Sequence, residues 1–593
     1  MKDPILFHQQ KVEGLALELN SLRIKRNTLT VLKLSVFVAI AVFAIFVFTS
    51  YSLPQLILFI TSILTFLGIT VLDEKTTNLY FLKKQLKKES QLELAYLNRN
   101  FSDLDEGLKF KDSKHNYSND LDLFGSDSLF QAINRTVTQK GKSKLAEWLL
   151  GSVKSPEEII ETQKGVNELK DFSEWRLLFR ATGTIKDLDE KETDFSSWLD
   201  PATFFNKKWT PALYITVGLN ALVILAAVLD YIDLEIPFYT SGVLLFIAFR
   251  FLGYISKVHQ KLDVFAKNFE GYHRLIKQIG EQDFKSKRLI AIKANLFEGE
   301  HNSALAFQKV SKILNSFDQR SNILVTVMFN ALYMRDIFLL IELDKWKEKH
   351  NPFLLGWIDS LAEMDALNCL ANYHFNHPEF IYPTPVESTI ISAKDLGHPA
   401  IPKANRVCND FEISKNHRMD IVTGANMAGK STFLRTVGVN LILAKCGAPV
   451  CASKFEFKPI TLFTSMRTSD DLADETSYFH AELLRLKLLV NITEASHQVF
   501  IILDEILKGT NSTDKLNGSK RFLTRLLQLP VSGLVATHDL ELGRLEKEYP
   551  LNFKNTCFEI TIDGNEIDYN YKLKSGISKN MNATLLMESM ELI

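Results

Sequence analysis

The longest uncharged stretch of this chain limits its fold more than any other feature. It runs from Leu34 to Leu72 and is interrupted only by a polar segment, Ser50–Gln55, that contains Pro54. Each half is long enough to cross about 30 Å of hydrocarbon at about 1.5 Å of rise per residue. A secretory signal peptide is disfavoured, because the preceding residues 1–33 are polar and charged. Buried core helices are the alternative; we predict a transmembrane hairpin over residues 31–74, after a cytoplasmic helix over residues 1–30.

A second pair of apolar segments, Trp209–Leu229 and Ile236–Ile255, surrounds an acidic loop. Arg250 lies near the end of the second segment, where a long side chain can reach the lipid headgroups. We predict a second transmembrane hairpin over residues 206–256. Basic residues flank both hairpins: Arg23, Lys25, Arg26 and Lys33; Lys75, Lys83, Lys84, Lys87 and Lys88; and Lys207, Lys208 and Lys257. Because such residues stay in the cytoplasm, we expect a multi-pass protein of the lipid bilayer with cytoplasmic termini and intervening segments.

The overall composition disfavours several classes of function. The 593 residues carry 69 basic and 70 acidic side chains, which gives a formal net charge of -1. No polybasic field therefore points to nucleic acid. The 5 cysteines include no CxxC spacing, which argues against a disulfide framework or a structural zinc site and favours a reducing compartment.

Outside the apolar segments the patterning changes from helical to mixed. The segments Asp105–Trp198 and Ser256–Tyr373 carry apolar residues at helical spacing, as in LAEWLL and LIKQIG, and predict plain helical packing. We assign them to two helical parts of the chain over residues 75–205 and 257–382. From residue 383 onward, short apolar strands alternate with helices, and the strands are MDIVT, VFIIL and GLVAT. The segment FEITIDGNEIDYNYKL predicts a β-hairpin that turns at Asp563-Gly564. The expected fold class is multidomain, α and α/β.

The sequence TGANMAGKST follows the strand MDIVT and fits the phosphate-binding loop pattern. Backbone N–H groups of such a loop face phosphates at the N-terminus of a helix, and its glycines allow close approach. Lys430 is predicted to reach the β- and γ-phosphates of ATP, and the Ser431 hydroxyl to ligate Mg²⁺. The predicted ATP-binding residues of the loop are Gly424, Ala425, Asn426, Met427, Ala428, Gly429, Lys430, Ser431 and Thr432.

The other two strands also end in groups that suit phosphate chemistry. VFIIL leads into Asp504 and Glu505, and GLVAT leads into His538. The carboxyl ends of parallel strands meet at one edge of a sheet, where ligands bind. We predict that Asp504 holds Mg²⁺, directly or through water, that Glu505 is the general base for the attacking water, and that His538 senses the γ-phosphate. With Lys430, they predict an ATP hydrolase that uses ATP and Mg²⁺.

Several segments together resemble the ATPase motifs of the MutS family, the DNA mismatch-repair ATPases. They are GANMAGKSTFLR, TSDDLADETSYFHAEL, LDEILKGTNSTD and ATH. Asn426-Met427 inside the loop is typical of this family and unusual among other phosphate-loop proteins. SLFQAINRTVTQKGKSKLAEWL is similar to the start of the family's lever domain, DLGHPAI to the entry of its ATPase domain, and KSGISKNMNATLLM to the segment that closes that domain.

The resemblance implies a fold and partners that the patterns alone do not. It implies a helical lever/core domain and a C-terminal phosphate-loop ATPase domain of the ABC type over residues 383–593. Phe411 matches an aromatic residue that stacks on adenine, and Ser477 matches a serine presented to the γ-phosphate across a dimer. A homodimer through the ATPase domain and DNA binding, with a role in repair or recombination, are therefore expected.

Other parts of the chain depart from the family pattern. The family's N-terminal mismatch-reading domain and its DNA-gripping clamp have no recognisable counterpart, and the membrane hairpins occupy their neighbourhoods. The loop GTNSTDKLNG is longer than the usual GTSTYDG, which puts the dimer contact there in doubt. The resulting hypothesis is a membrane-anchored MutS-like ATPase. Two alternatives without a DNA role stay open: an ATP-driven membrane transporter or remodeller, although the LSGGQ-type signature of transport ATPases is missing, and an ATP-dependent membrane scaffold.

Overall fold

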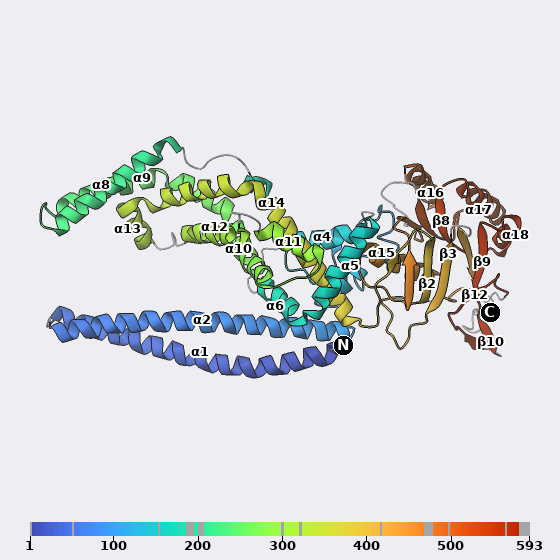
Figure 1. Cartoon of the computed structure of the whole chain (residues 1–593), viewed down its shortest axis with the longest axis horizontal. Helices are drawn as coiled ribbons and strands as arrows, with labels where there is room; N and C mark the ends of the chain where they lie inside the picture. Colours follow the sequence, from blue (N-terminus) through green and yellow to red (C-terminus); the bar gives the residue numbers. More distant parts are fainter. Residues whose placement is uncertain are drawn as a thin grey trace.

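The computed structural model of the chain is elongated, with an α/β domain at one end and the tips of apolar helices at the other (Figure 1). The structure describes residues 3–49, 52–151, 154–184, 195–199, 207–297, 302–318, 323–414, 418–467, 478–495, 498–563 and 566–579. A helical region lies between the two ends.

Helices α1 (Pro4–Thr49) and α2 (Leu53–Leu97) form a long antiparallel hairpin (Figure 1). Pro54 lies in the first turn of α2, where a proline removes no helical hydrogen bond. Lys33 and Asp73, the charged residues that border the apolar tip, form a 3.1 Å ion pair across the hairpin. The predicted boundaries at residues 30 and 74 fall inside continuous helices, because Leu, Lys, Gln and Glu residues continue both elements beyond the apolar run.

The second apolar region contains three helices, of which the sequence predicted two. The predicted hairpin is present as α8 (Thr210–Val228) and α9 (Glu235–Arg250). It ends at Arg250 rather than at Ile255, because the helix is interrupted at Phe251. The third helix, α13 (Ile323–Tyr333), lies in a segment predicted as plain helical packing, but it is apolar and packs against α9, which was not predicted.

Three helices of the described chain, α1, α2 and α8, are long and apolar enough to cross a membrane. Their most apolar windows are 0%, 0% and 11% buried. A fourth candidate is the pair of α13 and α14 (Arg335–Asn376), which bends by 77° where the two helices meet. These properties rest on length and composition, and they leave the membrane attachment itself a proposal.

One hydrophobic core joins the two helical halves of the chain into a lever domain. Its helices are α3 (Leu129–Ile133), α4 (Gln139–Leu150), α5 (Pro156–Asp171), α6 (Ser173–Thr184), α7 (Ser196–Leu199), α10 (Leu252–Glu281), α11 (Lys287–Phe297), α12 (Ser303–Asp318) and α14. A capping box starts α5: the Ser155 hydroxyl accepts from the Glu158 N–H, and the Glu158 carboxylate accepts from the Ser155 N–H. α14 packs on helices from both halves, and its Leu367 and Leu370 are fully buried. The two segments predicted as helical therefore fold as one domain.

A buried ionic cluster fixes α2 to the lever domain. The Glu93 carboxylate accepts hydrogen bonds from Arg135 Nε at 2.7 Å, from Asn376 Nδ2 at 2.7 Å and from Arg180 Nη1. Arg180 Nη2 also pairs with Glu89 at 2.7 Å. Burial alone would raise the pKa of Glu93, but Arg135 and Arg180 lower it well below its ordinary value. The charged carboxylate is therefore the form that this junction requires.

The C-terminal domain contains a six-stranded sheet in the order β12-β9-β4-β8-β7-β6, parallel except for β12. Its strands are β4 (Met419–Gly424), β6 (Thr461–Ser465), β7 (Val499–Asp504), β8 (Val531–Thr537), β9 (Phe553–Phe558) and β12 (Leu573–Ser575). The helices are α15 (Lys430–Cys446), α16 (Tyr478–Ala495), α17 (Ser512–Leu526) and α18 (Leu545–Glu548). β4 and β8 are buried at every residue, as their mostly apolar, non-alternating sequences predict.

A smaller four-stranded sheet, in the order β1-β5-β2-β3, packs beside the first. Its strands are β1 (Thr384–Pro385), β5 (Lys454–Phe457), β2 (Thr389–Leu396) and β3 (Asn409–Ser414). The predicted β-hairpin is present as β10 (Thr561–Asp563) and β11 (Glu566–Asp568), in which Asp563 pairs with Glu566. The first strand of the α/β region in chain order is therefore β1, which begins at Thr384.

Candidate functional site

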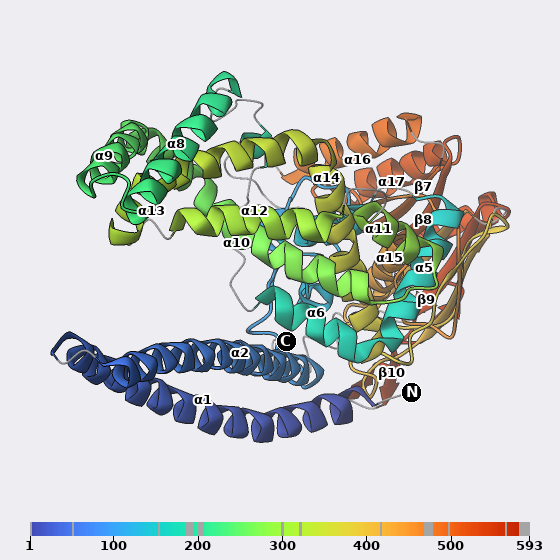
Figure 2. The same ribbon diagram turned by 60° about the vertical axis from the view of Figure 1, so that its left-hand side comes forward.

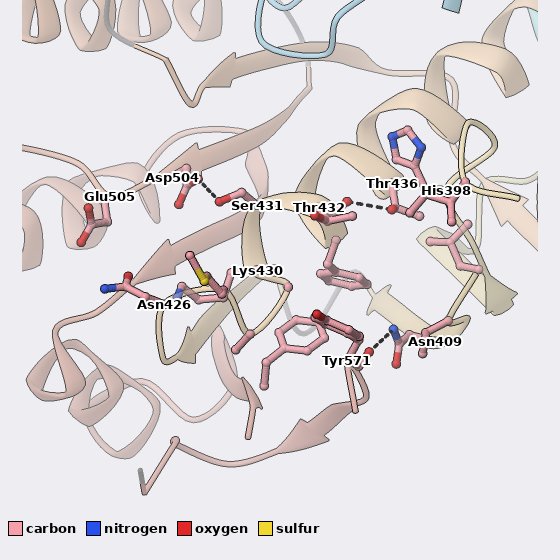
Figure 3. A pocket seen from close by; sticks show the side chains of 18 of the residues that line it. His398, Asn409, Asn426, Lys430, Ser431, Thr432, Thr436, Asp504, Glu505 and Tyr571 are labelled. Atoms are coloured by element: carbon pink, nitrogen blue, oxygen red, sulfur yellow. Dashed lines mark hydrogen bonds between the residues drawn. The ribbon is translucent and has the colours of Figure 1, made fainter. Parts of the chain in front are cut away.

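Parallel strands bring functional groups to one edge of the large sheet, where a cavity of about 480 Å³ opens. β4 leads into the loop before α15, β7 ends at Asp504, and β8 ends directly before His538. The predicted residues Lys430, Ser431, Asp504, Glu505 and His538 all line this cavity. Figure 3 shows four of them, Lys430, Ser431, Asp504 and Glu505, on neighbouring elements of the site.

The loop between β4 and α15 has a backbone that only particular residues tolerate. Gly424 and Gly429 have φ values of 153° and 106°, and a Cβ on Gly424 would lie 2.7 Å from the Phe558 carbonyl oxygen. Residues 426–432 line the cavity, whereas Gly424 and Ala425 lie behind it. The loop ends at the N-terminus of the 17-residue helix α15, whose unpaired N–H groups favour an anion.

Lys430 closes this loop in the present structure. Its ammonium donates hydrogen bonds of 2.7 Å to the carbonyl oxygens of both Gly424 and Ala425. Burial lowers the pKa of Lys430 to about 8, while Asp504 and Glu505 oppose that shift. A phosphate in the cavity can replace these two carbonyl partners with a full negative charge.

Ser431 and Asp504 lie in contact although they are far apart in the sequence. The Ser431 hydroxyl donates to Asp504 Oδ2 at 2.7 Å (Figure 3). A hydroxyl and a carboxylate side by side at the cavity give the hard oxygen donors that Mg²⁺ prefers. The donor set therefore fits the predicted metal, with room left for phosphate and water oxygens.

Glu505 occupies an unusual backbone position directly after β7. Its φ is 55° and that of Leu507 is 61°, both left-handed. The buried Glu482 of α16 supports this turn, because its carboxylate accepts from the N–H groups of Leu507 and, at 3.0 Å, of Lys508. Glu482 was part of a motif that the sequence analysis quoted, but its role as the support of this turn was not predicted.

The Glu505 carboxylate faces two cations and the imidazole. Lys515 Nζ lies 3.5 Å and Lys508 Nζ 3.7 Å from its oxygens, and His538 Nε2 lies 4.0 Å from Oε1. Burial, followed by the charge of Lys430, lowers the pKa of His538 below its ordinary value. The imidazole is therefore neutral at neutral pH, and it can donate or accept a hydrogen bond beside Glu505.

The structure places Phe411 away from the cavity. Its side chain is 4% exposed, and its ring packs edge-on against Phe433, with ring centroids 5.4 Å apart. Phe433 lines the cavity and Phe411 lies behind it. The Phe411 ring therefore does not line the cavity in this structure, and its stacking on adenine stays a prediction. Tyr571, which lines the cavity and is 42% exposed, is an aromatic residue that can offer an open ring face.

Sequence reasoning missed this wall of the cavity. Besides Tyr571 it contains His398, Asn405 and Asn409. Asn409 ties the wall together: its Nδ2 donates to the Tyr571 carbonyl at 3.1 Å and its Oδ1 accepts from the Leu573 N–H at 2.8 Å (Figure 3). Tyr571 lies more than a hundred positions after the other three residues, so no local pattern could have linked them.

Two of the segments that resemble MutS-family motifs, TSDDLADETSYFHAEL and KSGISKNMNATLLM, lie partly outside the described residues. Ser477 and the residues 468–476 before it are among those not described, so its predicted role across a dimer stays a prediction. The closing segment is described as far as Lys579. There the Ser578 N–H donates to the Thr423 hydroxyl of β4 at 3.0 Å, which attaches the segment to the strand before the loop.

Comparison with known proteins agrees with this geometry. Residues 420–587 match the family described as MutS domain V. The chain is 27% identical over 501 residues to the DNA mismatch repair protein MutS of Persephonella marina, a match that covers 77% of this chain and 56% of that protein. The chain belongs to the MutS family.

Other MutS-family relatives match shorter parts of the chain. The DNA mismatch repair protein MutS of Thermotoga sp. is 31% identical over 239 residues, covering 39% of this chain and 29% of the relative. MutS protein homolog 4 of Mus musculus is 28% identical over 300 residues, covering 46% of this chain and 30% of the relative. The chain thus spans about half the length of the Persephonella relative and about a third of the others.

Proposed function

We propose that this MutS-family protein is a membrane-anchored ATP hydrolase. One observation carries the proposal: the Ser431–Asp504 contact lies in the same cavity as Lys430, Glu505 and His538. That set supplies a phosphate-binding loop, an oxygen donor pair for Mg²⁺ and a carboxylate base.

The residues divide the reaction between them. The loop N–H groups and Lys430 hold the β- and γ-phosphates, and Ser431 and Asp504 hold the metal. Mg²⁺ would neutralise charge on the phosphate oxygens. Glu505 orients a water molecule and accepts its proton as the water oxygen bonds to the γ-phosphorus and the bond to the β,γ-bridging oxygen breaks. The bridging oxygen leaves with the electron pair as part of ADP, and the ammonium groups of Lys508 and Lys515 lie beside the Glu505 carboxylate.

The membrane attachment rests on the apolar helices. The uncharged tip of the α1–α2 hairpin and α8 are exposed, and positively charged residues border them. We infer that both hairpins span a bilayer and that the lever and ATPase domains lie in the cytoplasm. α2 then connects the bilayer to the site, because Arg99, which follows it, donates to the Ala400 carbonyl at 2.7 Å, next to the cavity residue His398.

Dimerisation and DNA binding are the parts of the proposal that the family supplies. The relatives are named for DNA mismatch repair, and on that basis we propose that two copies pair through their ATPase domains around ATP and bind mismatched or branched DNA. A role in DNA repair or recombination follows from the same basis. Exposed lysines of the lever domain, such as Lys285 and Lys287, are available for phosphate contacts.

ATP hydrolysis in lipid nanodiscs tests the proposal. We expect Glu505→Gln to lower the rate at least about 100-fold, as loss of a general base does, while Glu412→Gln, an exposed change on β3, leaves it unaltered. Duplex, mismatched and branched DNA are added at two salt concentrations. A Glu505-dependent rate that DNA changes, more weakly at high salt, supports the DNA role. A rate that responds to no DNA removes that role. Equal rates in both variants remove Glu505 as the base, and no hydrolysis by the unaltered protein removes the hydrolase assignment.

A further inference from the structure

Helix α13 has the burial pattern of a water-soluble helix turned inside out. Its large apolar side chains face outward, with Leu324 81% and Met328 50% exposed. Its polar side chains face inward: Thr326 is 8% and Asn330 1% exposed. Water favours the opposite arrangement, because exposing apolar surface to it is unfavourable. An apolar solvent on the outside removes that contradiction.

The helices before and after α13 both belong to the lever domain. They are α12 and α14, and both contribute to its core. The flanking helices also touch, because Arg335 Nη2, at the start of α14, donates to the Ser316 carbonyl of α12 at 2.9 Å. The 11 residues of α13 span about 16 Å, roughly half of a hydrocarbon layer of about 30 Å. α13 therefore cannot cross a bilayer.

The break after α13 is closed by side chains rather than by water. Helix ends leave carbonyl groups without helical partners, and in hydrocarbon no water is present to pair with them. Asn220, which lies midway along α8 and is buried, donates from Nδ2 to the Leu332 carbonyl at 3.2 Å. Its Oδ1 accepts from the Thr240 hydroxyl of α9 at 2.7 Å, and Asn330 Oδ1 accepts from the Asp336 N–H at 3.1 Å. One asparagine thus links all three apolar helices at the break.

The α8, α9 and α13 helices also lie at the end of the molecule that carries the apolar tip of the α1–α2 hairpin. Figures 1 and 2 both show these elements at the same end, opposite the α/β domain. Two modules from distant parts of the sequence therefore present exposed apolar side chains at a common level. A bilayer is the one planar apolar partner that covers both at once.

We propose that α13 is a third membrane-embedded helix of the second apolar module, which enters the bilayer beside α8 and α9 and does not cross it. This inference rests on the proposed membrane attachment, and it adds a lipid-contacting element that the span criteria alone do not resolve.

Cysteine labelling in proteoliposomes tests the inference. All proteins carry Cys408→Ser, because the other four cysteines are buried. Leu324→Cys probes α13, Leu222→Cys probes the outer face of α8, and Lys277→Cys on α10 is the matched control in water. Vesicles are opened so that a membrane-impermeant maleimide reaches both sides, and labelling is normalised to protein unfolded in SDS. We expect Leu324→Cys and Leu222→Cys to label at no more than a tenth of the extent of Lys277→Cys.

The remaining outcomes separate the inference from the proposal beneath it. Labelling of Leu324→Cys at the level of Lys277→Cys, with Leu222→Cys still protected, overturns the embedded α13 alone. Equal labelling at all three positions overturns the membrane attachment as well. A second copy of the chain could also protect Leu324→Cys from labelling. To distinguish it from lipid, a bimane is attached to Leu324→Cys and nitroxide-labelled lipid is added, because contact with that lipid quenches the bimane fluorescence. A protected site without quenching overturns the inference.

Discussion

Strand β7 and helix α8 are both rich in apolar residues, but these residues are buried in β7 and largely exposed in α8. In β7, every residue from Val499 to Leu503 is buried in the α/β domain. In α8, the leucines Leu219, Leu222 and Leu225 are exposed, and the polar Asn220 is buried. Composition alone therefore does not tell a core from a surface. The position of the polar side chain does, because a buried asparagine beside exposed leucines indicates an apolar solvent.

The same substitution in both elements gives the largest expected contrast. Ile501→Asp puts a carboxylate into the closed core of the sheet, and we expect a loss of more than about 4 kcal/mol, which unfolds the ATPase domain in any medium. Leu222→Asp replaces an exposed side chain, so it leaves ATP binding in detergent intact. In a bilayer it costs about 2.5–3.5 kcal/mol of insertion free energy. Thermal unfolding in detergent, monitored by the loss of nucleotide binding, measures the first effect. The fraction of the protein integrated into the membrane in cells measures the second.

Leu222→Ala is the matched control, since it shortens the side chain without adding a charge. A Leu222→Asp protein that unfolds in detergent as Ile501→Asp does would mean that protein rather than lipid covers this face of α8. The contrast between the two elements would then disappear.

The sequence predicted the features that depend on neighbouring residues, and it did not predict those that depend on contacts between distant parts of the chain. The phosphate-binding loop, Asp504-Glu505 and His538 each follow an apolar strand directly, so short patterns locate them. The role of Phe411 came from a family position, which does not say what packs over the ring, and here Phe433 does. Tyr571 reaches the cavity from a loop after a hairpin, which only the folded chain reveals. α13 is too short to pass as a span, and its inverted burial appears only once α8 and α9 are in place.

The junction between the two regions predicts an intermediate effect. Glu93→Gln removes the charge that compensates the buried Arg135 and Arg180, so we expect a loss of about 3–5 kcal/mol, as when one partner of a buried pair is removed. The control is Glu147→Gln, which breaks the exposed pair with Lys144 and costs at most about 1 kcal/mol. Thermal unfolding in detergent compares them. Equal shifts in both variants would show that the Glu93 cluster does not hold α2 in place.

The smallest predicted effect is a pH dependence of nucleotide binding. Burial gives Lys430 a pKa of about 8 without nucleotide, and a phosphate beside it raises that pKa. Above pH 8, nucleotide binding therefore requires Lys430 to take up a proton. The affinity for nucleotide is highest below that pH and falls by at most about tenfold per pH unit above it. A fluorescent, non-hydrolysable ATP analogue titrated between pH 7 and 9.5 measures this slope. Lys430→Arg keeps its charge throughout this range and should bind with a flat profile. An equal slope in both proteins would mean that a group other than Lys430 titrates. The pH dependence of the affinity would then not depend on the ammonium that donates to the Gly424 and Ala425 carbonyls.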